Sequence, residues 1–193
     1  IDDKGVNRIL SQISKKQKKI KEINKIKKNF DENKLSIREV NDNDINHYLK
    51  ARNLDININH SLNKKKILPL DHYNWWFNTN RKSYLLTKGD KKILYFYEEK
   101  IFSINKKEYL LSGWFACSKN CTIKDILYTL RWQRNLKKNA NWLSFIKKNN
   151  KLSIYLSKFL GWNIMNRNNL SLKKLKSRFK IDSKKFFIYE RNE

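Results

Sequence analysis

The alternation of apolar and polar residues divides the chain into two regions. Across residues 5–30, apolar side chains recur close to helical spacing, and eight lysines lie between positions 15 and 28. The apolar positions are Ile9, Ile13, Ile20, Ile23, Ile26 and Phe30. This pattern predicts a basic amphipathic helix within a segment of residues 1–34. It is typical of a linker helix with a solvated face, and helices that bind a membrane surface or RNA share it.

From Leu35 onwards, β-rich segments alternate with helical ones, which predicts one domain over residues 35–193. Asn41 to Asp44 have turn and N-cap chemistry ahead of a helix that ends near Asn53, and Gly89-Asp90 marks a hairpin turn. Further helices are expected from Pro69 to about Asn80, from Ile123 to Lys138 and from Leu152 to Leu160. Strands are expected at Leu35–Val40, Tyr84–Thr87, Lys92–Glu98, Tyr109–Cys117, Trp142–Ile146 and Phe186–Tyr189.

The element order β-α-α-β-β-β-α-β-α-β predicts the fold class. It is that of an α/β (α+β) domain with a mixed, mainly antiparallel sheet flanked by helices. The chain has 193 residues, 39% of them hydrophobic, with six tryptophans, so it has ample material for a core. Two full domains and global disorder are both disfavoured.

The formal net charge of +26 favours polyanionic partners. Basic surfaces attract nucleic acids through their phosphates. However, the chain contains 35 lysines, 26 asparagines and 21 isoleucines but only 9 arginines. AT-rich coding produces that bias, whereas proteins that read bases rely on the bidentate guanidinium of arginine. We therefore expect small polyanions such as CoA or a nucleotide sugar rather than nucleic acid.

The cysteines and histidines form no recognisable metal motif. Cys117 and Cys121 are the only cysteines, in a C-x3-C spacing, and the three histidines lie far apart in the sequence. Because a structural zinc site needs four ligands, we expect two reduced thiols and no bound metal.

The start of the chain shows no targeting segment. It begins at Ile1 without a charged and then apolar leader, and no run of about 18 apolar residues could span a bilayer. We expect a cytoplasmic fragment of a larger protein with no membrane span.

The segment from Asn150 to Trp162 reads Asn-Lys-Leu-Ser-Ile-Tyr-Leu-Ser-Lys-Phe-Leu-Gly-Trp. Together with the element order, it resembles the Asn-x-x-Ala/Ser-x-x-Leu-x-x-x-x-Gly-Phe motif of the GNAT acetyltransferases, over roughly residues 35–190. Asn150 can cap a helix, Ser153 is small where CoA must pass, and Gly161 can end the helix. A generic capped amphipathic helix has the same pattern. The resemblance implies acetyl-CoA as the acyl donor.

A second resemblance concerns the acceptor. Ala51-Arg52-Asn53, Ile67 and the run from His72 to Phe77 resemble Trp-Arg-Asn and Ile-x-x-x-x-His-x-x-Trp-Phe patterns. These patterns belong to the amino-sugar N-acetyltransferases of pseudaminic acid biosynthesis, and Ala51 replaces their usual Trp. The resemblance implies a nucleotide-linked amino sugar as acceptor.

The same resemblance implies that four residues bind the acceptor, with His72 also relaying a proton at neutral pH. They are Arg52, Asn53, His72 and Trp75. In the simpler interpretation, the aromatic residues of this run are the buried face of a helix. We expect that for Phe77, and both interpretations stay open for His72.

The first nine residues show a third resemblance. Ile1 to Ile9 resemble the Asp-Gly-x-Gly-x-x-Arg-Ile end of the UDP-sugar hydrolases, with Asp3 where Gly is usual. This implies a fusion in which a UDP-sugar hydrolase domain precedes the acetyltransferase.

The GNAT resemblance also implies where the cofactor binds. Pantetheine hydrogen-bonds in this family to the fourth strand where it splays from the fifth, which here implicates the backbone of Trp114, Phe115, Ala116 and Cys117. The diphosphate sits on N–H groups that begin the next helix, which implicates Lys119, Asn120 and Thr122.

The loop before that helix departs from the family pattern. Its Gly-rich sequence is replaced by residues 118–123, and Thr122-x-x-Asp125 is typical of a capping box that uses the same donors. Either CoA binds mostly through pantetheine, or this copy of the enzyme is weakened or inactive.

The group that protonates the departing thiolate also differs. In many GNAT enzymes it is a Tyr seven residues after the motif Asn, a position held here by Ser157. Tyr155 lies about 200° round the helix from that position, so we expect it to point away and pack. Ser157 is therefore the candidate acid, with a weaker effect than a phenol.

These features predict an N-acetyltransferase that acetylates a nucleotide-linked amino sugar in surface-glycan biosynthesis. Two alternatives stay open. One is an acetyltransferase for a protein N-terminus or another amine. The other is a degenerate GNAT scaffold that serves as a basic nucleic-acid or partner-binding module.

Overall fold

A computed structural model describes residues 35–104, 107–137, 140–166 and 170–191 of the chain. Its strands are β1 (Leu35–Glu39), β2 (Lys82–Lys88), β3 (Lys91–Ile104), β4 (Lys107–Ala116), β5 (Asn141–Lys147), β6 (Asn163–Ile164) and β7 (Phe186–Arg191). Its helices are the short 3-10 helix η2 (Asp42–Asp44), α3 (Ile45–Arg52), α4 (Asp55–Ile58), α5 (Pro69–Asn78), α6 (Ile123–Leu136), α7 (Lys151–Phe159) and α8 (Leu170–Phe179).

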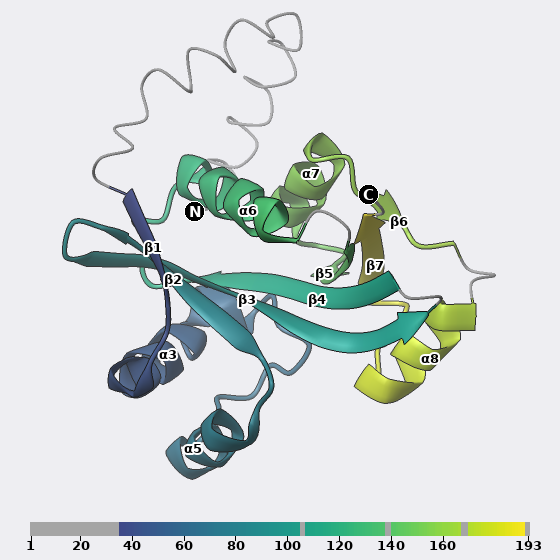
Figure 1. Cartoon of the computed structure of the whole chain (residues 1–193). Helices are drawn as coiled ribbons and strands as arrows, with labels where there is room; N and C mark the ends of the chain where they lie inside the picture. Colours follow the sequence, from purple (N-terminus) through teal and green to yellow (C-terminus); the bar gives the residue numbers. More distant parts are fainter. Residues whose placement is uncertain (1–34, 105–106, 138–139, 167–169, 192–193) are drawn as a thin grey trace, which may run out of the picture.

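The strands form one seven-stranded sheet in the order β1-β2-β3-β4-β5-β7-β6. Neighbouring strands are antiparallel except for β4 and β5, which are parallel. Helices α6 and α7 lie over one face of the sheet, and α3, α5 and α8 lie on the opposite side (Figure 1). The predicted α/β class with a mixed, mainly antiparallel sheet is confirmed.

Most predicted elements are present, and three were missed. Helix α4 and strand β6 have only four and two residues, too few for a hydrophobic period to be visible. Helix α8 does carry a usable pattern, because Leu172, Leu175 and Phe179 recur at helical spacing among its lysines. The predicted basic helix within residues 5–30 lies outside the described residues.

Both faces of the sheet are packed. On the α6/α7 side, Leu86, Leu94, Ile126 and Leu156 form one cluster, whereas Tyr48, Leu85, Tyr95 and Phe115 form another beneath α3. The ring of Tyr48 contacts Trp75, Trp76, Tyr95 and Phe115 at centroid distances of 4.8–5.8 Å. These rings fix α3 and α5 against the sheet, since aromatic pairs add to the burial of their apolar area.

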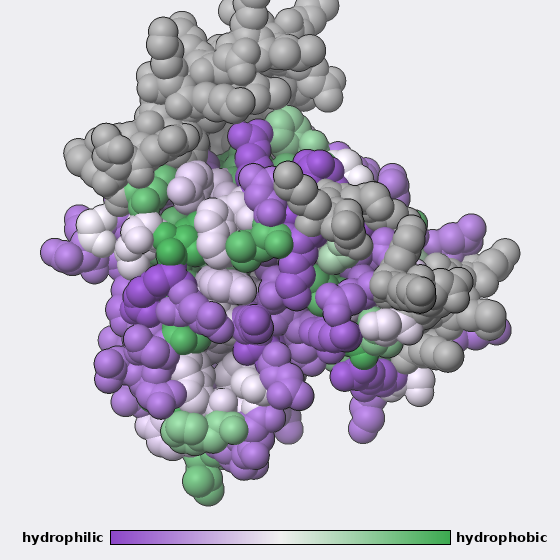
Figure 2. Space-filling model, viewed as in Figure 1, coloured by the Kyte–Doolittle hydropathy of each residue, from purple (hydrophilic) through white to green (hydrophobic). Residues whose placement is uncertain are grey.

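Phe77 departs from its predicted place in the core, because 69% of its surface is exposed. Trp75 and Trp76 already occupy the inner side of α5, and the next residue is turned by about 100° towards solvent. Leu68 and Leu70 are exposed nearby. The face of the molecule drawn in Figure 2 is mostly hydrophilic. Green residues lie at its lower end, where α5 lies in Figure 1, and also in its middle and upper parts.

Neither a membrane span nor a metal cluster is found in the described ranges. None of the helices there has the length and apolar composition needed to cross a bilayer. No three histidine, cysteine, aspartate or glutamate side chains within those ranges are grouped so that they could hold a metal ion.

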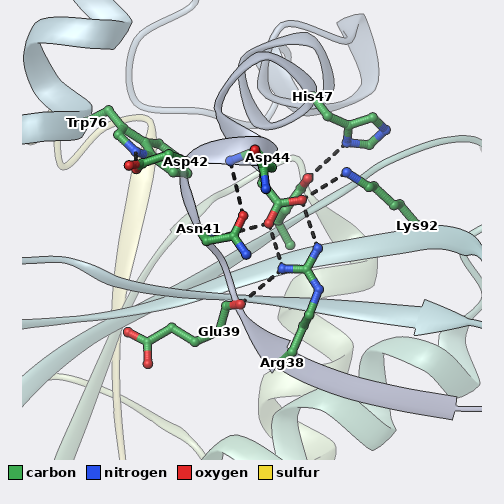
Figure 3. Close-up of polar contacts among 10 residues, drawn as sticks. Arg38, Glu39, Asn41, Asp42, Asp44, His47, Trp76 and Lys92 are labelled. Atoms are coloured by element: carbon green, nitrogen blue, oxygen red, sulfur yellow. Dashed lines mark hydrogen bonds and ion pairs between the residues drawn. The ribbon is translucent and has the colours of Figure 1, made fainter.

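A buried carboxylate, Asp44, joins β1, η2 and β3 (Figure 3). Asp44 is 1% exposed; its oxygens accept hydrogen bonds from the Arg38 guanidinium at 2.6 and 2.9 Å and from Lys92 Nζ at 2.9 Å. The Asn41 N–H also donates to this carboxylate, within a capping box. Burial would raise the pKa of Asp44, but the hydrogen bonds from Arg38 and Lys92 outweigh it and hold the pKa well below its usual value.

Asp44→Asn should destabilise the fold by about 2 kcal/mol, as measured by urea unfolding at neutral pH. The change leaves two cations facing a neutral amide, and the cost is moderated because Arg38 and Lys92 are partly exposed and can rehydrate. Since the folded-state pKa of Asp44 is depressed, the ion pairs stabilise the fold above an unfolded pKa of about 3.9 and cease to do so as pH falls towards the folded value.

The difference between wild type and Asp44→Asn should therefore shrink as the pH is lowered below about 4. Asp90→Asn is the matched control, because it removes the same charge from an exposed turn. Equal stability changes in the two variants at neutral pH would contradict this role of Asp44.

Candidate functional site

The parallel strands β4 and β5 are paired over a short stretch, which we call the seam, and then separate. They pair only at Tyr109 with Asn141, Leu110 with Trp142 and Leu111 with Leu143. Beyond Leu111, β4 continues to Ala116 and β5 to Lys147 without further pairing. The sheet therefore opens into a wedge.

A cavity of about 550 Å³ lies within this wedge. It is lined on one side by residues 111–116 of β4 and on the other by residues 144–147 of β5, with α7 and the loop after β4 completing its walls. A pocket of this size can enclose a cofactor arm or a small ligand.

The backbone of β4 offers one free stretch to this cavity. The Cys117 N–H donates to the Ile93 carbonyl at 2.9 Å, so by the alternation of an antiparallel ladder Cys117 and Phe115 direct their backbone groups to β3. Trp114 and Ala116 face the opposite way, towards the wedge. Ala116 is already bonded by a side chain, which leaves the N–H and C=O of Trp114 directed at the cavity.

That side chain belongs to Asn57, a residue that sequence reasoning missed. Asn57 is buried; its Nδ2 donates to the carbonyls of Ala51 at 2.7 Å and Ala116 at 2.8 Å, and its Oδ1 accepts from the Ala116 N–H at 3.1 Å. The amide thus replaces a missing strand partner at the end of β4. Its position on the short helix α4 gave no visible pattern, and its partner Ala116 lies 59 residues away.

Helix α7 forms the opposite wall through the residues that its motif indicates. The Asn150 Oδ1 caps the helix by accepting from the Ser153 N–H at 3.1 Å. Asn150, Ser153 and Ser157 all line the cavity. Tyr155 does not; it packs against the α6 side of the core and stacks on Phe159. This placement agrees with the expectation that Tyr155 points away.

The loop before α6 satisfies three of its own backbone donors. The N–H groups of Asn120 and Cys121 bond Ser118, and the Thr122 N–H donates to the Asp125 carboxylate at 2.8 Å. The predicted capping box of Thr122 and Asp125 is confirmed. Asn120 and Thr122 do not line the cavity, whereas Lys119 does. A diphosphate at this helix start would meet several donors already in use and the nearby Asp125 carboxylate.

Two arginines lie at the end of the cavity beneath α3. Arg81 is ion-paired with Glu99 at 2.7 Å, and its guanidinium lies 4.0 Å from the centre of the Tyr97 ring. Burial would lower the pKa of Arg81, but Tyr97, Tyr48 and Glu99 raise it above its usual value. Arg52 also lines the cavity, and burial lowers its pKa. Arg81 had no sequence motif to mark it.

Four of the other predicted residues lie away from the cavity. His72 is 1% exposed, and its Nε2 is 3.1 Å from the Ile45 carbonyl, so it carries a hydrogen there. The Asn53 side chain donates from Nδ2 to the Ile67 carbonyl and accepts at Oδ1 from the Ile67 N–H. Trp75 stacks on Tyr48, and Cys117 packs against the same cluster. Burial raises the pKa of Cys117 to about 12.

Because Gly113 has no side chain, the Tyr97 ring can lie close to the backbone of β4. A Cβ atom built on Gly113 would lie 2.6 Å from Cζ of Tyr97, far inside van der Waals contact. The phenol ring therefore lies directly over the strand beside Trp114, and any side chain at position 113 would push it away.

Gly113→Ala should destabilise the fold by about 2 kcal/mol, because the rigid ring of Tyr97 must move. In a Tyr97→Ala background the same change should be neutral or stabilising, since Ala is the better strand residue once the ring is absent. Urea unfolding of the four proteins in this double-mutant cycle measures the coupling. Equal costs in both backgrounds would show that the ring does not cause the constraint.

Comparisons with known proteins bear on the fold. No family model matches the sequence, and no curated protein matches it. The structure is similar to a ribosomal-protein-alanine N-acetyltransferase from Brucella melitensis, with a TM-score of 0.57 and 11% identity, covering 82% of this chain and 99% of that one. It is similar to a GNAT-family acetyltransferase from Streptococcus pneumoniae, with a TM-score of 0.54, 11% identity, and 82% and 99% coverage.

A third similar structure, from Salmonella typhimurium, was solved with its cofactor acetyl-CoA. Its TM-score is 0.57 at 10% identity, with 82% of this chain and 94% of that chain covered. At such identities the likeness concerns the fold alone. The described domain has the fold of the GNAT acetyltransferases.

Proposed function

We propose that this protein is an N-acetyltransferase that uses acetyl-CoA. The observation that carries the proposal is the wedge between β4 and β5, in which the backbone of Trp114 faces a cavity of about 550 Å³. A strand that stops pairing inside a sheet leaves directed donors and acceptors, which suit the amides of a pantetheine arm.

Each end of the cavity has residues suited to one part of the cofactor. Ser153 and Asn150 line its α7 wall, where a small side chain leaves room for the arm. Lys119 supplies a positive charge for the phosphates at the mouth. Because three N–H groups of the loop before α6 already have partners and the Asp125 carboxylate lies beside them, we infer that affinity comes mainly from the pantetheine contacts.

The reaction needs positioning and charge stabilisation more than covalent help. A neutral amine attacks the thioester carbonyl, the carbon–nitrogen bond forms, and the oxyanion collapses with cleavage of the carbon–sulfur bond. The amine loses one proton and the CoA thiolate gains one. Ser157 lies on the cavity wall, where its hydroxyl can hydrogen-bond the thiolate. A thiolate whose conjugate acid has a pKa of about 8.5 needs little further help.

The finer proposal is that the amine belongs to a nucleotide-linked amino sugar. Its support is the resemblance of residues 51–77 to that group of enzymes, together with Arg52 and Arg81 at the end of the cavity beneath α3. One guanidinium group can donate two parallel hydrogen bonds to two phosphate oxygens of a diphosphate. Since Glu99 already pairs with Arg81, Arg52 is the better candidate for the diphosphate. His72 instead holds α5 against α3.

Acetyl-CoA should raise the melting temperature of the protein. A ligand at about a hundred times its Kd, binding only the folded state, adds about 2.7 kcal/mol of stability. Lys119→Glu should weaken binding about tenfold and reduce its salt dependence. Lys158→Glu is the matched control, because Lys158 is exposed on α7 outside the cavity lining. A folded sample whose melting temperature does not change in millimolar acetyl-CoA would refute the enzyme proposal.

The acceptor is tested separately with Arg52→Gln. For a UDP-linked amino sugar, KM should rise about tenfold with little change in kcat, because the diphosphate contact is the same in the ground and transition states. Acetylation of the free amino sugar should be unaffected by the same change. Equal losses with both acceptors would show that Arg52 does not read the diphosphate, and activity with neither would favour another amine.

A further inference from the structure

A second cavity, of about 300 Å³, lies where the ends of α6 and α7 meet β5 and β7. It shares Leu130, Leu160 and Trp162 with the wedge cavity as a common wall, but it has its own lining at the last turns of α6. The proposed acetyl transfer assigns it no role. We call it the arginine pocket, after Arg131, Arg134 and Arg191 that line it.

The arginine pocket gathers guanidinium groups, which are uncommon in this lysine-rich chain. It holds three of the 9 arginines in the sequence. Arg131 and Arg134 are three residues apart and so lie on the same side of α6. Arg191 donates to the Leu160 carbonyl at the end of α7, which fixes its guanidinium at the rim.

Two indole rings complete the pocket. Trp142 is 2% exposed, and its Nε1 has no hydrogen-bond partner among the described residues. Buried donors are nearly always paired, and leaving one unpaired is costly. Trp162 packs against the small core cluster that contains Trp142. The turn after α7 places it there: Gly161 has a φ of 78°, and the Trp162 N–H donates to the Ser157 carbonyl.

We propose that the arginine pocket binds a small anion that carries a flat ring, of the class of a nucleoside monophosphate. Guanidinium groups bind phosphate or carboxylate oxygens bidentately, and the indole of Trp162 offers a face for stacking. An acceptor on the ligand ring would satisfy Trp142 Nε1. The volume is suited to one such molecule and too small for a whole CoA.

The test is calorimetric titration of the full chain with four probes. Adenosine 5′-monophosphate and uridine 5′-monophosphate present a base and a phosphate, benzoate presents a ring with a carboxylate, and inorganic phosphate has no ring. At least one ring-bearing anion should bind, and phosphate alone should bind more weakly because stacking is lost. Benzoate binding as tightly as the nucleotides would show that the pocket does not prefer a phosphate to a carboxylate, which would contradict the nucleoside monophosphate class.

Arg131→Gln should weaken binding of the ring-bearing anion about tenfold, the effect of losing one charge-assisted contact. Trp162→Ala should weaken it similarly, whereas Trp162→Phe should retain most of it. Lys119→Gln is the control for the wedge cavity and Lys158→Gln for overall charge, since each removes one positive charge outside the arginine pocket.

Three results would overturn the proposal. One is that none of the ring-bearing probes binds at millimolar concentration to folded protein. Another is that Lys119→Gln weakens binding while Arg131→Gln does not, which would move the probe to the wedge cavity. The third is binding to long oligonucleotides alone, with equal affinity in the Arg131 variant, which would assign it to the general basic surface.

Discussion

The requirement that buried backbone groups find partners governs the site. Strand β4 lies inside the sheet, yet β5 leaves it after Leu111. The polypeptide meets this requirement at one end only, where Asn57 bonds both the N–H and C=O of Ala116. Trp114 lies between the seam and that amide, so its polar groups face the cavity. The shape of the sheet thus creates the unpaired strand segment on which the proposed chemistry depends.

Local features of the fold could be predicted from the sequence, and long-range ones could not. The Gly89-Asp90 turn, the capping box at Thr122 and the orientation of Tyr155 follow from residues a few positions apart. The contact of Asn57 with Ala116 joins residues 59 apart, and a lone asparagine in the sequence has many other uses. The resemblance likewise implied that His72 and Asn53 bind the acceptor. In the structure, His72 is buried and hydrogen-bonds the Ile45 carbonyl, and Asn53 hydrogen-bonds the backbone of Ile67.

Lysine and arginine have different places in this molecule. Lysines supply most of the positive charge, in keeping with a coding bias. Several arginines make specific contacts: Arg38 with Asp44, Arg81 with Glu99, and Arg178 with the Ile101 carbonyl. A planar guanidinium satisfies several acceptors at fixed angles, which an ammonium group does not. In this lysine-rich chain, arginines therefore make several of the contacts that need fixed hydrogen-bond geometry.

The short seam between β4 and β5 also has a consequence for the order of folding. Strands β2, β3 and β4 pair as consecutive hairpins, whereas β5 joins β4 through only three residue pairs, whose members lie 32 positions apart in the sequence. Local pairings form early at low entropic cost, and a parallel connection through α6 forms late. We therefore expect β5 and β7 to dock onto a preformed meander of β2 to β4, and amide hydrogens along the seam to exchange before those of β3. The wedge cavity, lined by both strands, lies next to this late-forming seam.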